Sequence, residues 1–278
     1  YRKACRIIDE FKPDIAIGFG GYVSAPVMLA AHHKHVATMI HEQNSIVGVS
    51  NKMVAKYMDA IVICYEKCFE EFGREKTRLL GNPRATNAVH AKFDRDYFLS
   101  LGLSLHKPLI LVVMGSLGST SVNAIMKDAL PAVSERYQIL FVTGKNNYEE
   151  MRKQIHAPHV KVVDYVKQLD IMAHVDLIVC RAGATTAAEI TALGTPSILV
   201  PSPYVAHNHQ FYNASVLVDH KAAVMLEEKD LNAEALSNAI DRIMSDDLLR
   251  ASMHSASLAL GKPNASEDIL NWCDEMKR

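Results

Sequence analysis

Short apolar runs alternate with longer segments of mixed polarity along most of the chain. Uninterrupted apolar runs are typical of strands in a parallel sheet, whereas apolar residues spaced three and four apart are typical of helices. The pattern predicts strands at residues 14–18, 36–40, 60–64, 77–80, 109–113, 138–143, 160–163, 175–180, 197–200 and 222–226. It predicts helices at residues 1–11, 26–32, 46–57, 66–72, 94–101, 122–136, 148–155, 166–173, 185–193, 210–219, 231–244, 248–260 and 265–276.

This regular alternation predicts an α/β architecture with parallel sheets. The alternation breaks at residues 81–84, and residues 85–107 carry no strand signal. We therefore predict two Rossmann-like, doubly wound domains that face a cleft. The first comprises residues 1–84 and the second residues 85–263, and the C-terminal helix within residues 264–278 is expected to pack back on the first domain.

Composition narrows the class of protein. Of the 278 residues, 49% are hydrophobic and 22% are charged, and the formal net charge is −1. With this net charge, the chain as a whole has no excess of positive charge that would attract nucleic acid. No apolar run approaches the roughly 18–20 residues that span a bilayer. The five cysteines are scattered, and Cys64 and Cys68 lack a second pair, so we expect reduced thiols in a cytoplasmic protein and no zinc site.

The stretch from Val175 to Pro201 predicts a binding site. An apolar strand leads into the small-residue turn 181–184, and a helix follows. Backbone N–H groups at a helix start are unpaired and lie at the positive end of the helix dipole, so a diphosphate can dock there. Glu189 shares a helix face with Thr185, and its carboxylate can accept both hydroxyls of an attached ribose.

A structural interpretation of the same stretch remains open. The residues from Thr186 to Glu189 fit a capping box, in which the Glu189 carboxylate only bonds the backbone N–H of Thr186. The small residues of the turn can also serve only to let the helix pack closely on the sheet.

Two other patterns invite a metal site, and we favour neither. Asp94 and Asp96 do not follow a strand; they precede a predicted helix, where carboxylates cap helix starts. His207 and His209 lie two residues apart with no carboxylate nearby in the sequence, which is a poor ligand pattern. We therefore expect no metal.

Polar loops at the ends of predicted strands occur together in an order that resembles the MurG family of peptidoglycan N-acetylglucosaminyltransferases. The motifs are residues 20–24 (GGYVS), 41–44 (HEQN), 81–84 (GNPR), 115–118 (GSLG), 180–184 (CRAGA) with Glu189, and 201–214. The resemblance runs nearly the whole length of the chain. The family also has a glycine-rich first turn carrying a histidine, which precedes these motifs. Because the chain begins at Tyr1, inside a predicted helix, we expect an N-terminally truncated chain with an incomplete first domain.

The resemblance implies a GT-B fold and an inverting transfer that uses no cofactor. The family moves N-acetylglucosamine from UDP-N-acetylglucosamine to undecaprenyl-diphosphate-linked muramyl-pentapeptide, forming the second lipid intermediate. The reaction takes place at the cytoplasmic face of the cell membrane, so the resemblance implies peripheral membrane contact. An apolar segment, residues 27–29, precedes the basic residues 32–35 and suggests such contact, although the sequence alone favours a surface amphipathic helix.

The resemblance also implies a role for individual residues. For the nucleotide part of the donor, it implies that Glu189 binds the ribose hydroxyls and that Val166 contacts the uracil. By the same resemblance, phosphate and sugar are contacted by Ala184, Thr185 and Thr186, and the diphosphate by Ser116 and Arg84. Gln210 is expected to bind the sugar hydroxyls, and Asn44 to reach across the cleft from the first domain to the N-acetylglucosamine. The acceptor hydroxyl must lose a proton as it attacks, so a general base is required. The candidates that remain are Tyr22, His41 and Glu42.

Two other functions remain open at this point. A UDP-sugar 2-epimerase has a similar two-domain fold, and release of free N-acetylmannosamine would identify it. A donor-binding fragment without transfer activity would bind nucleotide but give no turnover.

Overall fold

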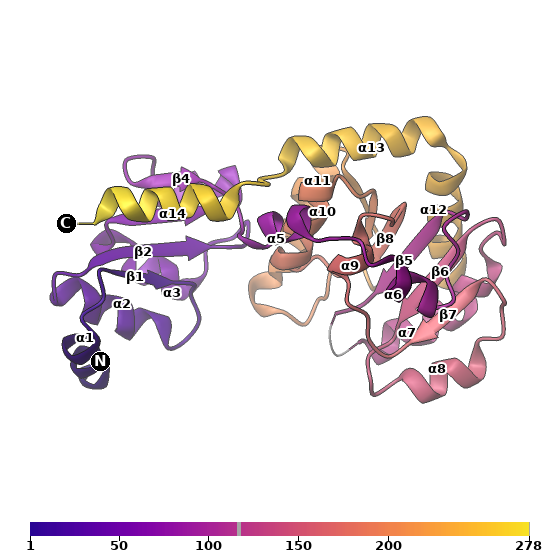
Figure 1. The fold of residues 1–278 in the computed structure, drawn as a ribbon, viewed down its shortest axis with the longest axis horizontal. Coiled ribbons are helices and arrows are strands. Elements are labelled where there is room, and N and C mark those ends of the chain that lie inside the picture. The colour runs from indigo at the N-terminus through magenta and orange to yellow at the C-terminus, as the bar shows by residue number, and fades with distance from the viewer. Residues whose placement is uncertain (116–117, 278) are drawn as a thin grey trace. The chain divides into compact units, whose positions relative to one another are not determined.

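The computed structural model describes residues 1–115 and 118–277, which form two compact units (Figure 1). The first unit contains residues 1–86 and 262–278, and the second contains residues 87–261. Each unit has one parallel sheet, in the orders β1-β2-β3-β4 and β10-β9-β8-β5-β6-β7. The predicted α/β class with parallel sheets is confirmed.

The sheet of the first unit consists of four strands. They are β1 (Ile15–Gly18), β2 (Ala37–Glu42), β3 (Ala60–Ile63) and β4 (Thr77–Leu79). Its helices are α1 (Arg2–Phe11), α2 (Ser24–His33), α3 (Val49–Val54), α4 (Phe69–Phe72) and α14 (Ala265–Met276), with 3₁₀ turns at Ala55–Tyr57 and Glu66–Cys68. We predicted that the second strand ends at residue 40, which is wrong. The parallel ladder continues, pairing His41 with Val62 and Glu42 with Ile63.

Both faces of the two central strands, β2 and β3, are buried, which explains why these strands read as continuous apolar runs. In β3, Ile61 and Ile63 pack with Met28 of α2. The alternate residues of β3 point to the opposite face and pack with Trp272 of α14. Figure 1 shows α14, in yellow, lying along the sheet although it is the last helix of the chain.

Two helix predictions near the first unit need correction. The helix predicted at 46–57 begins only at Val49, after Gly48, and ends in a 3₁₀ turn. An additional helix, α5 (Arg84–His90), precedes residue 94, where we predicted the first helix after the break in the alternation. Its start is marked by Asn82, whose side-chain oxygen accepts a hydrogen bond from the Arg84 backbone N–H at 3.0 Å. The Asn-Pro pair before Arg84 is a helix-start signal that the sequence offers.

The second unit has six strands. They are β5 (Leu109–Val113), β6 (Gln138–Val142), β7 (Val160–Val163), β8 (Leu177–Cys180), β9 (Ser197–Leu199) and β10 (Ala223–Met225). Its helices are α6 (Arg95–Ser100), α7 (Thr120–Ala129), α8 (Tyr148–Gln154), α9 (Leu169–Met172), α10 (Ala184–Leu193), α11 (His209–Asp219), α12 (Ala233–Ser245) and α13 (Asp247–Leu260), with 3₁₀ turns at Leu130–Ala132 and Ala206–Asn208.

Two helices of this unit are shorter than predicted. The helix predicted at 122–136 ends at Ala129 and passes into a 3₁₀ turn that contains Pro131, because proline lacks the N–H that would continue the helix. The helix predicted at 166–173 is limited to α9, so Val166 lies in the loop that precedes it.

The order of the strands in the second sheet determines where a ligand can bind. The chain starts in the middle with β5, continues outward through β6 and β7, and then returns to place β8 on the other side of β5. The loops after β5 and β8 therefore leave the same edge of the sheet in opposite directions. In open α/β sheets, ligands bind at this topological switch point.

Asp94 is a helix cap, as predicted. Its carboxylate accepts a hydrogen bond from the Tyr97 backbone N–H at 2.9 Å at the start of α6. Within the described residues, no group of three or more His, Cys, Asp and Glu side chains is placed to hold a metal ion.

We expect Asp94→Ala to lower the free energy of unfolding of the second unit by about 1 kcal/mol, because one backbone donor of α6 loses its partner. Urea denaturation followed by circular dichroism measures this change. Asp96→Ala is the matched control, since Asp96 lies in the first turn without being the N-cap and should change stability by only a few tenths of a kcal/mol. Equal losses in the two variants would contradict the assignment of the cap.

Candidate functional site

The turn between β8 and α10 leaves room for a ligand at the switch point. Gly183 is the N-cap of α10, and a Cβ built on it would meet nothing within 4 Å. Among the described residues no side chain caps the helix, and the first backbone N–H groups of α10, from Ala184 to Thr186, face this space without an intrahelical partner. The arrangement provides an anion site of the helix-start type.

The capping-box interpretation of this stretch is wrong. In a capping box, Thr186 would be the residue before the helix, but α10 begins at Ala184 and Thr186 is already in its first turn. The Glu189 carboxylate instead accepts a hydrogen bond from the Gln168 side chain at 3.1 Å. Glu189 is therefore held from the loop after β7 and is only 3% exposed.

Gln168 also links Glu189 to the segment that contains Val166. Gln168 lies two residues after Val166, at the N-cap of α9, and its amide contacts the sulfur of Met172 at 3.3 Å. The structure thus brings the segment with Val166 next to Glu189, although 23 residues separate the two in the sequence. Cys180 lies at the end of β8, and burial, together with the nearby Glu189 charge, raises the pKa of its thiol, so this neighbour stays uncharged.

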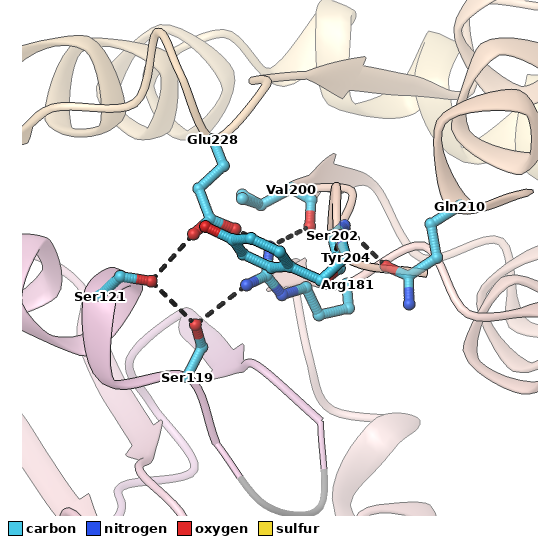
Figure 2. Close-up of polar contacts among 8 residues, drawn as sticks. All are labelled: Ser119, Ser121, Arg181, Val200, Ser202, Tyr204, Gln210 and Glu228. Carbon is cyan, nitrogen blue, oxygen red and sulfur yellow. Dashed lines mark hydrogen bonds and ion pairs between the residues drawn. The ribbon is translucent and has the colours of Figure 1, made fainter. Parts of the chain in front are cut away.

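Gln210 lies in the first turn of α11 and is oriented by the loop after β9. Its side-chain oxygen accepts a hydrogen bond from the Ser202 backbone N–H at 2.9 Å (Figure 2). With the oxygen engaged, the amide NH₂ is the part of Gln210 that remains to contact a ligand, and it can only donate. Ser116, which we predicted together with Arg84 for the diphosphate, lies outside the described residues.

In the first unit, the Glu42 carboxylate organises the loop that follows β2. It accepts hydrogen bonds from the backbone N–H groups of Asn44 at 3.1 Å and Gly48 at 2.9 Å, and from the Asn51 side chain at 2.9 Å. Glu42 is 2% exposed. Because both oxygens accept hydrogen bonds from the loop, the carboxylate holds Asn44 in place.

His41 is buried beside Glu42 and is uncharged near neutral pH. Its Nε2–H donates to the Gly81 carbonyl at 2.9 Å, while Nδ1 finds no hydrogen-bond partner among the described residues. Burial lowers the pKa of His41 below 6.5, and the bond to Gly81 and the Glu42 charge oppose this effect without reversing it. The ring of Phe19 lies over it, with 5.3 Å between ring centroids.

The lowered pKa of His41 has a measurable consequence. Since the unfolded chain binds this proton first, the stability gained from neutral His41 is present above pH 6.5 and is lost as the pH falls toward the folded pKa. We expect His41→Gln, whose amide can still donate to Gly81, to lose less stability than the parent between pH 7 and pH 5. Fluorescence of Trp272, the single tryptophan, reports the first unit. The control is His106→Gln at an exposed site of the second unit. If the free energy of unfolding changed with pH by the same amount in the parent, His41→Gln and His106→Gln, the prediction would be contradicted.

The remaining predicted residues of the first unit differ in exposure. Tyr22 is 97% exposed and lies in a turn with Gly20 and Gly21, both of which have positive φ angles. Asn44 and Arg84 are half-buried. Arg84 is the first residue of α5, so its position depends on the Asn82 hydrogen bond at the start of that helix.

The sequence pattern missed three side chains that position others. Gln168 contacts Glu189, and Asn51 contacts Glu42, across separations that no local motif reveals. Arg181 belongs to a motif that we identified, but no role followed from its position in the sequence. In the structure it contacts the loops after other strands (Figure 2).

Two α/β units with wholly parallel sheets, and a helix start open to an anion at the switch point of the second, form the GT-B fold, and the family matches identify the chain as a glycosyltransferase of this class. Residues 1–63 match the glycosyltransferase family 28 N-terminal domain, and residues 109–269 match its C-terminal domain.

Individual relatives define the family more closely. The UDP-N-acetylglucosamine–N-acetylmuramyl-(pentapeptide) pyrophosphoryl-undecaprenol N-acetylglucosamine transferase of Limosilactobacillus reuteri is 44% identical, over 96% of this chain and 74% of its own length. The enzyme of that name from Bacillus subtilis is 39% identical, over 100% of this chain and 78% of its own length. The crystal structure of Acinetobacter baumannii MurG matches with a TM-score of 0.83 at 25% identity, over 99% of this chain and 77% of that chain. The chain belongs to the MurG family.

The epimerases share the fold of this chain. The structure of the UDP-GlcNAc 2-epimerase from Neisseria meningitidis has a TM-score of 0.71 but only 11% identity, over 97% of this chain and 78% of that chain. At this identity the similarity shows a common fold and carries no argument for epimerase activity.

Proposed function

We propose that this chain transfers N-acetylglucosamine from UDP-N-acetylglucosamine to a muramyl-pentapeptide linked to undecaprenyl diphosphate, with inversion at the sugar carbon. The observation that carries this proposal is the 39–44% identity, over nearly the whole chain, to transferases named for this reaction. The open helix start of α10 and the buried Glu189 carboxylate provide the chemistry that a uridine diphosphate donor needs.

The second unit is proposed to bind the nucleotide part of the donor. The diphosphate lies at the start of α10, where Gly183 permits close approach and the backbone N–H groups of residues 184–186 donate to it. The carboxylate of Glu189 accepts the two ribose hydroxyls, and Val166 contacts the uracil. The amide NH₂ of Gln210 donates to oxygens of the sugar.

The first unit is proposed to supply groups for the transfer itself. Breaking the bond from the sugar carbon to the diphosphate oxygen leaves negative charge on the departing uridine diphosphate, and Arg84 stabilises that charge. Asn44, held in place by Glu42, donates to the N-acetylglucosamine. Ser116 also contacts the diphosphate in this proposal.

Among the three base candidates, His41 fits general-base chemistry best. Burial keeps its imidazole neutral at physiological pH, and the lone pair on Nδ1 is not used within the described residues. The Glu42 oxygens, in contrast, already accept hydrogen bonds from the loop. We propose that His41 takes the proton of the attacking acceptor hydroxyl and that Glu42 positions Asn44.

Because the acceptor is attached to a lipid, we also propose that the first unit contacts the cytoplasmic face of the membrane peripherally. No helix in the described residues is long and apolar enough to cross a bilayer. In the segment 27–29, Met28 is 1% exposed and belongs to the core, so the apolar trio does not form an outer face. Exposed apolar side chains adjoin this segment in the turn after β1, where Phe19, Tyr22 and Val23 are exposed, and Val27 itself is exposed at the start of the trio. Cosedimentation with anionic phospholipid vesicles tests the contact, and a chain that stays in the supernatant would contradict it.

One experiment separates the candidate functions. Calorimetry with UDP measures the donor site, and incubation with UDP-N-acetylglucosamine and the lipid-linked acceptor measures transfer. We expect UDP binding and formation of the disaccharide lipid. Free N-acetylmannosamine would identify an epimerase, and binding without turnover would identify a donor-binding fragment.

A further inference from the structure

Arg181 lies where a phosphate ligand is expected. It directly follows β8, two residues before the N-cap of α10, at the switch point between β5 and β8. A guanidinium next to a diphosphate would ordinarily bind it in a bidentate manner.

In the structure, however, both terminal nitrogens of Arg181 are engaged within the protein (Figure 2). Nη1 donates to the Val200 carbonyl at 3.1 Å and forms an ion pair with the Glu228 carboxylate at 2.8 Å. Nη2 donates to the Ser119 hydroxyl at 3.0 Å. One guanidinium therefore joins the loops that follow four strands, namely β5, β8, β9 and β10.

The network is closed and compensated in charge. The second oxygen of Glu228 accepts a hydrogen bond from the Ser121 hydroxyl at 2.8 Å, and the hydroxyls of Ser121 and Ser119 lie 3.3 Å apart. The side chains of Arg181 and Glu228 are only 11% and 12% exposed. If either side chain were removed at this depth, the other would remain as an uncompensated buried charge, and breaking the pair is therefore costly.

Ser119 connects this network to the turn after β5. It is the N-cap residue of α7 and directly follows Gly118, whose backbone packs against the Thr143 carbonyl. A shift of Arg181 would therefore move the start of α7 relative to the start of α10.

We propose that Arg181 is a positioning residue for the donor diphosphate rather than a ligand of it. Through Glu228 and Ser119 it fixes the start of α7 relative to the turn after β8, where the diphosphate is proposed to lie. This inference rests on the proposed function, because it takes the switch point as the donor site.

The informative variant is Glu228→Gln, which keeps the size of the side chain and removes its charge. If Arg181 positions the two turns, we expect UDP affinity to fall and the KM for UDP-N-acetylglucosamine to rise, each by about tenfold, because the turns are displaced. If Arg181 were a phosphate ligand restrained by Glu228, the freed guanidinium would bind UDP more tightly. Tighter binding would overturn the proposal.

A milder variant and a double-mutant cycle keep the test independent of folding. Ser119→Ala leaves the ion pair intact and is expected to raise KM severalfold with little change in thermal unfolding. If Arg181 acts through Glu228, Glu228→Gln added to Arg181→Met should cause little further loss of UDP affinity, whereas additive losses would contradict the coupling.

The matched control is Glu227→Gln in the same loop, since Glu227 pairs with Lys229 at 3.3 Å on the surface. It should leave KM and UDP affinity unchanged. An unsubstituted chain that does not bind UDP would overturn the donor site and the proposed function with it. An unsubstituted chain that binds UDP, with a Glu228→Gln variant that binds it equally well, would overturn only the role of Arg181.

Discussion

Glu189→Ala is expected to lower the affinity for UDP by about 10²–10⁴-fold. A hydrogen bond to a charged acceptor contributes about 1.5–3 kcal/mol, and the proposed site has two such bonds, one to each ribose hydroxyl. Calorimetric titration with UDP measures the loss.

The ribose analogue 2′-deoxy-UDP makes this prediction specific to the hydroxyl groups. The parent chain should bind 2′-deoxy-UDP about tenfold to a hundredfold more weakly than UDP, because one bond to Glu189 is absent. In the Glu189→Ala variant the two nucleotides should bind equally. A variant that still prefers UDP would show that another group reads the 2′-hydroxyl.

Two further variants separate binding from folding. Glu189 is buried and accepts a hydrogen bond from Gln168, so the alanine variant also leaves that amide without this partner. Glu189→Gln keeps the shape and should give a smaller loss of affinity with a near-parental melting temperature. Glu149→Ala, at an exposed position of α8, is the control and should change neither quantity.

Gly118→Ala is expected to destabilise the second unit by about 2–6 kcal/mol and to weaken UDP binding at least tenfold. Gly118 has a φ of +73°, and an added Cβ would lie 2.1 Å from the Thr143 carbonyl oxygen. Positive φ and the overlap each contribute about 1–3 kcal/mol. Thr143 cannot easily retreat, since its N–H donates to Val163 at 3.0 Å and its carbonyl accepts from Asn123 at 3.0 Å. The turn after β5 must move instead.

Gly183→Ala is the matched comparison for Gly118→Ala. Its φ is −67°, and the added Cβ would meet no protein atom within 4 Å, so we expect a loss of stability of at most about 1 kcal/mol. UDP affinity should still fall, because the methyl group would occupy the space proposed for the diphosphate. Thermal unfolding and calorimetry of both variants measure the two effects. Parental stability in Gly118→Ala, or parental affinity in Gly183→Ala, would contradict this account of the turns.

Much of the fold followed from local patterns. Each predicted strand is present, because uninterrupted apolar runs bounded by glycine and polar residues leave few alternatives in a parallel sheet. The errors lie at element ends. The strand predicted to end at residue 40 continues to Glu42 because β3 pairs with it, and the helix predicted to continue to 136 stops near Pro131. Asn82 and Pro83 indicate the start of α5, but our prediction did not use this helix-start signal.

The candidate site was predictable only in part. Residues of the turn after β8 and Glu189 are close in the sequence, so the spacing within one helix sufficed to place them on one side. The structure had to show that Gln168 holds Glu189 and that Asn51 holds Glu42. Neither amide belongs to a pattern of charges or glycines, and a single amide in a sequence carries no signal of its partner.

By itself, the sequence determined the α/β class, the positions of the strands and the motif order that indicates the family, because backbone propensity and apolar periodicity act over a few residues. Only the tertiary structure decided which loops meet. Arg181 lies 62 residues from Ser119 in the chain, and the two are in hydrogen-bond contact because β8 pairs with β5 rather than with its predecessor β7. Strand order depends on the packing of whole helices and sheets, and no local pattern encodes it.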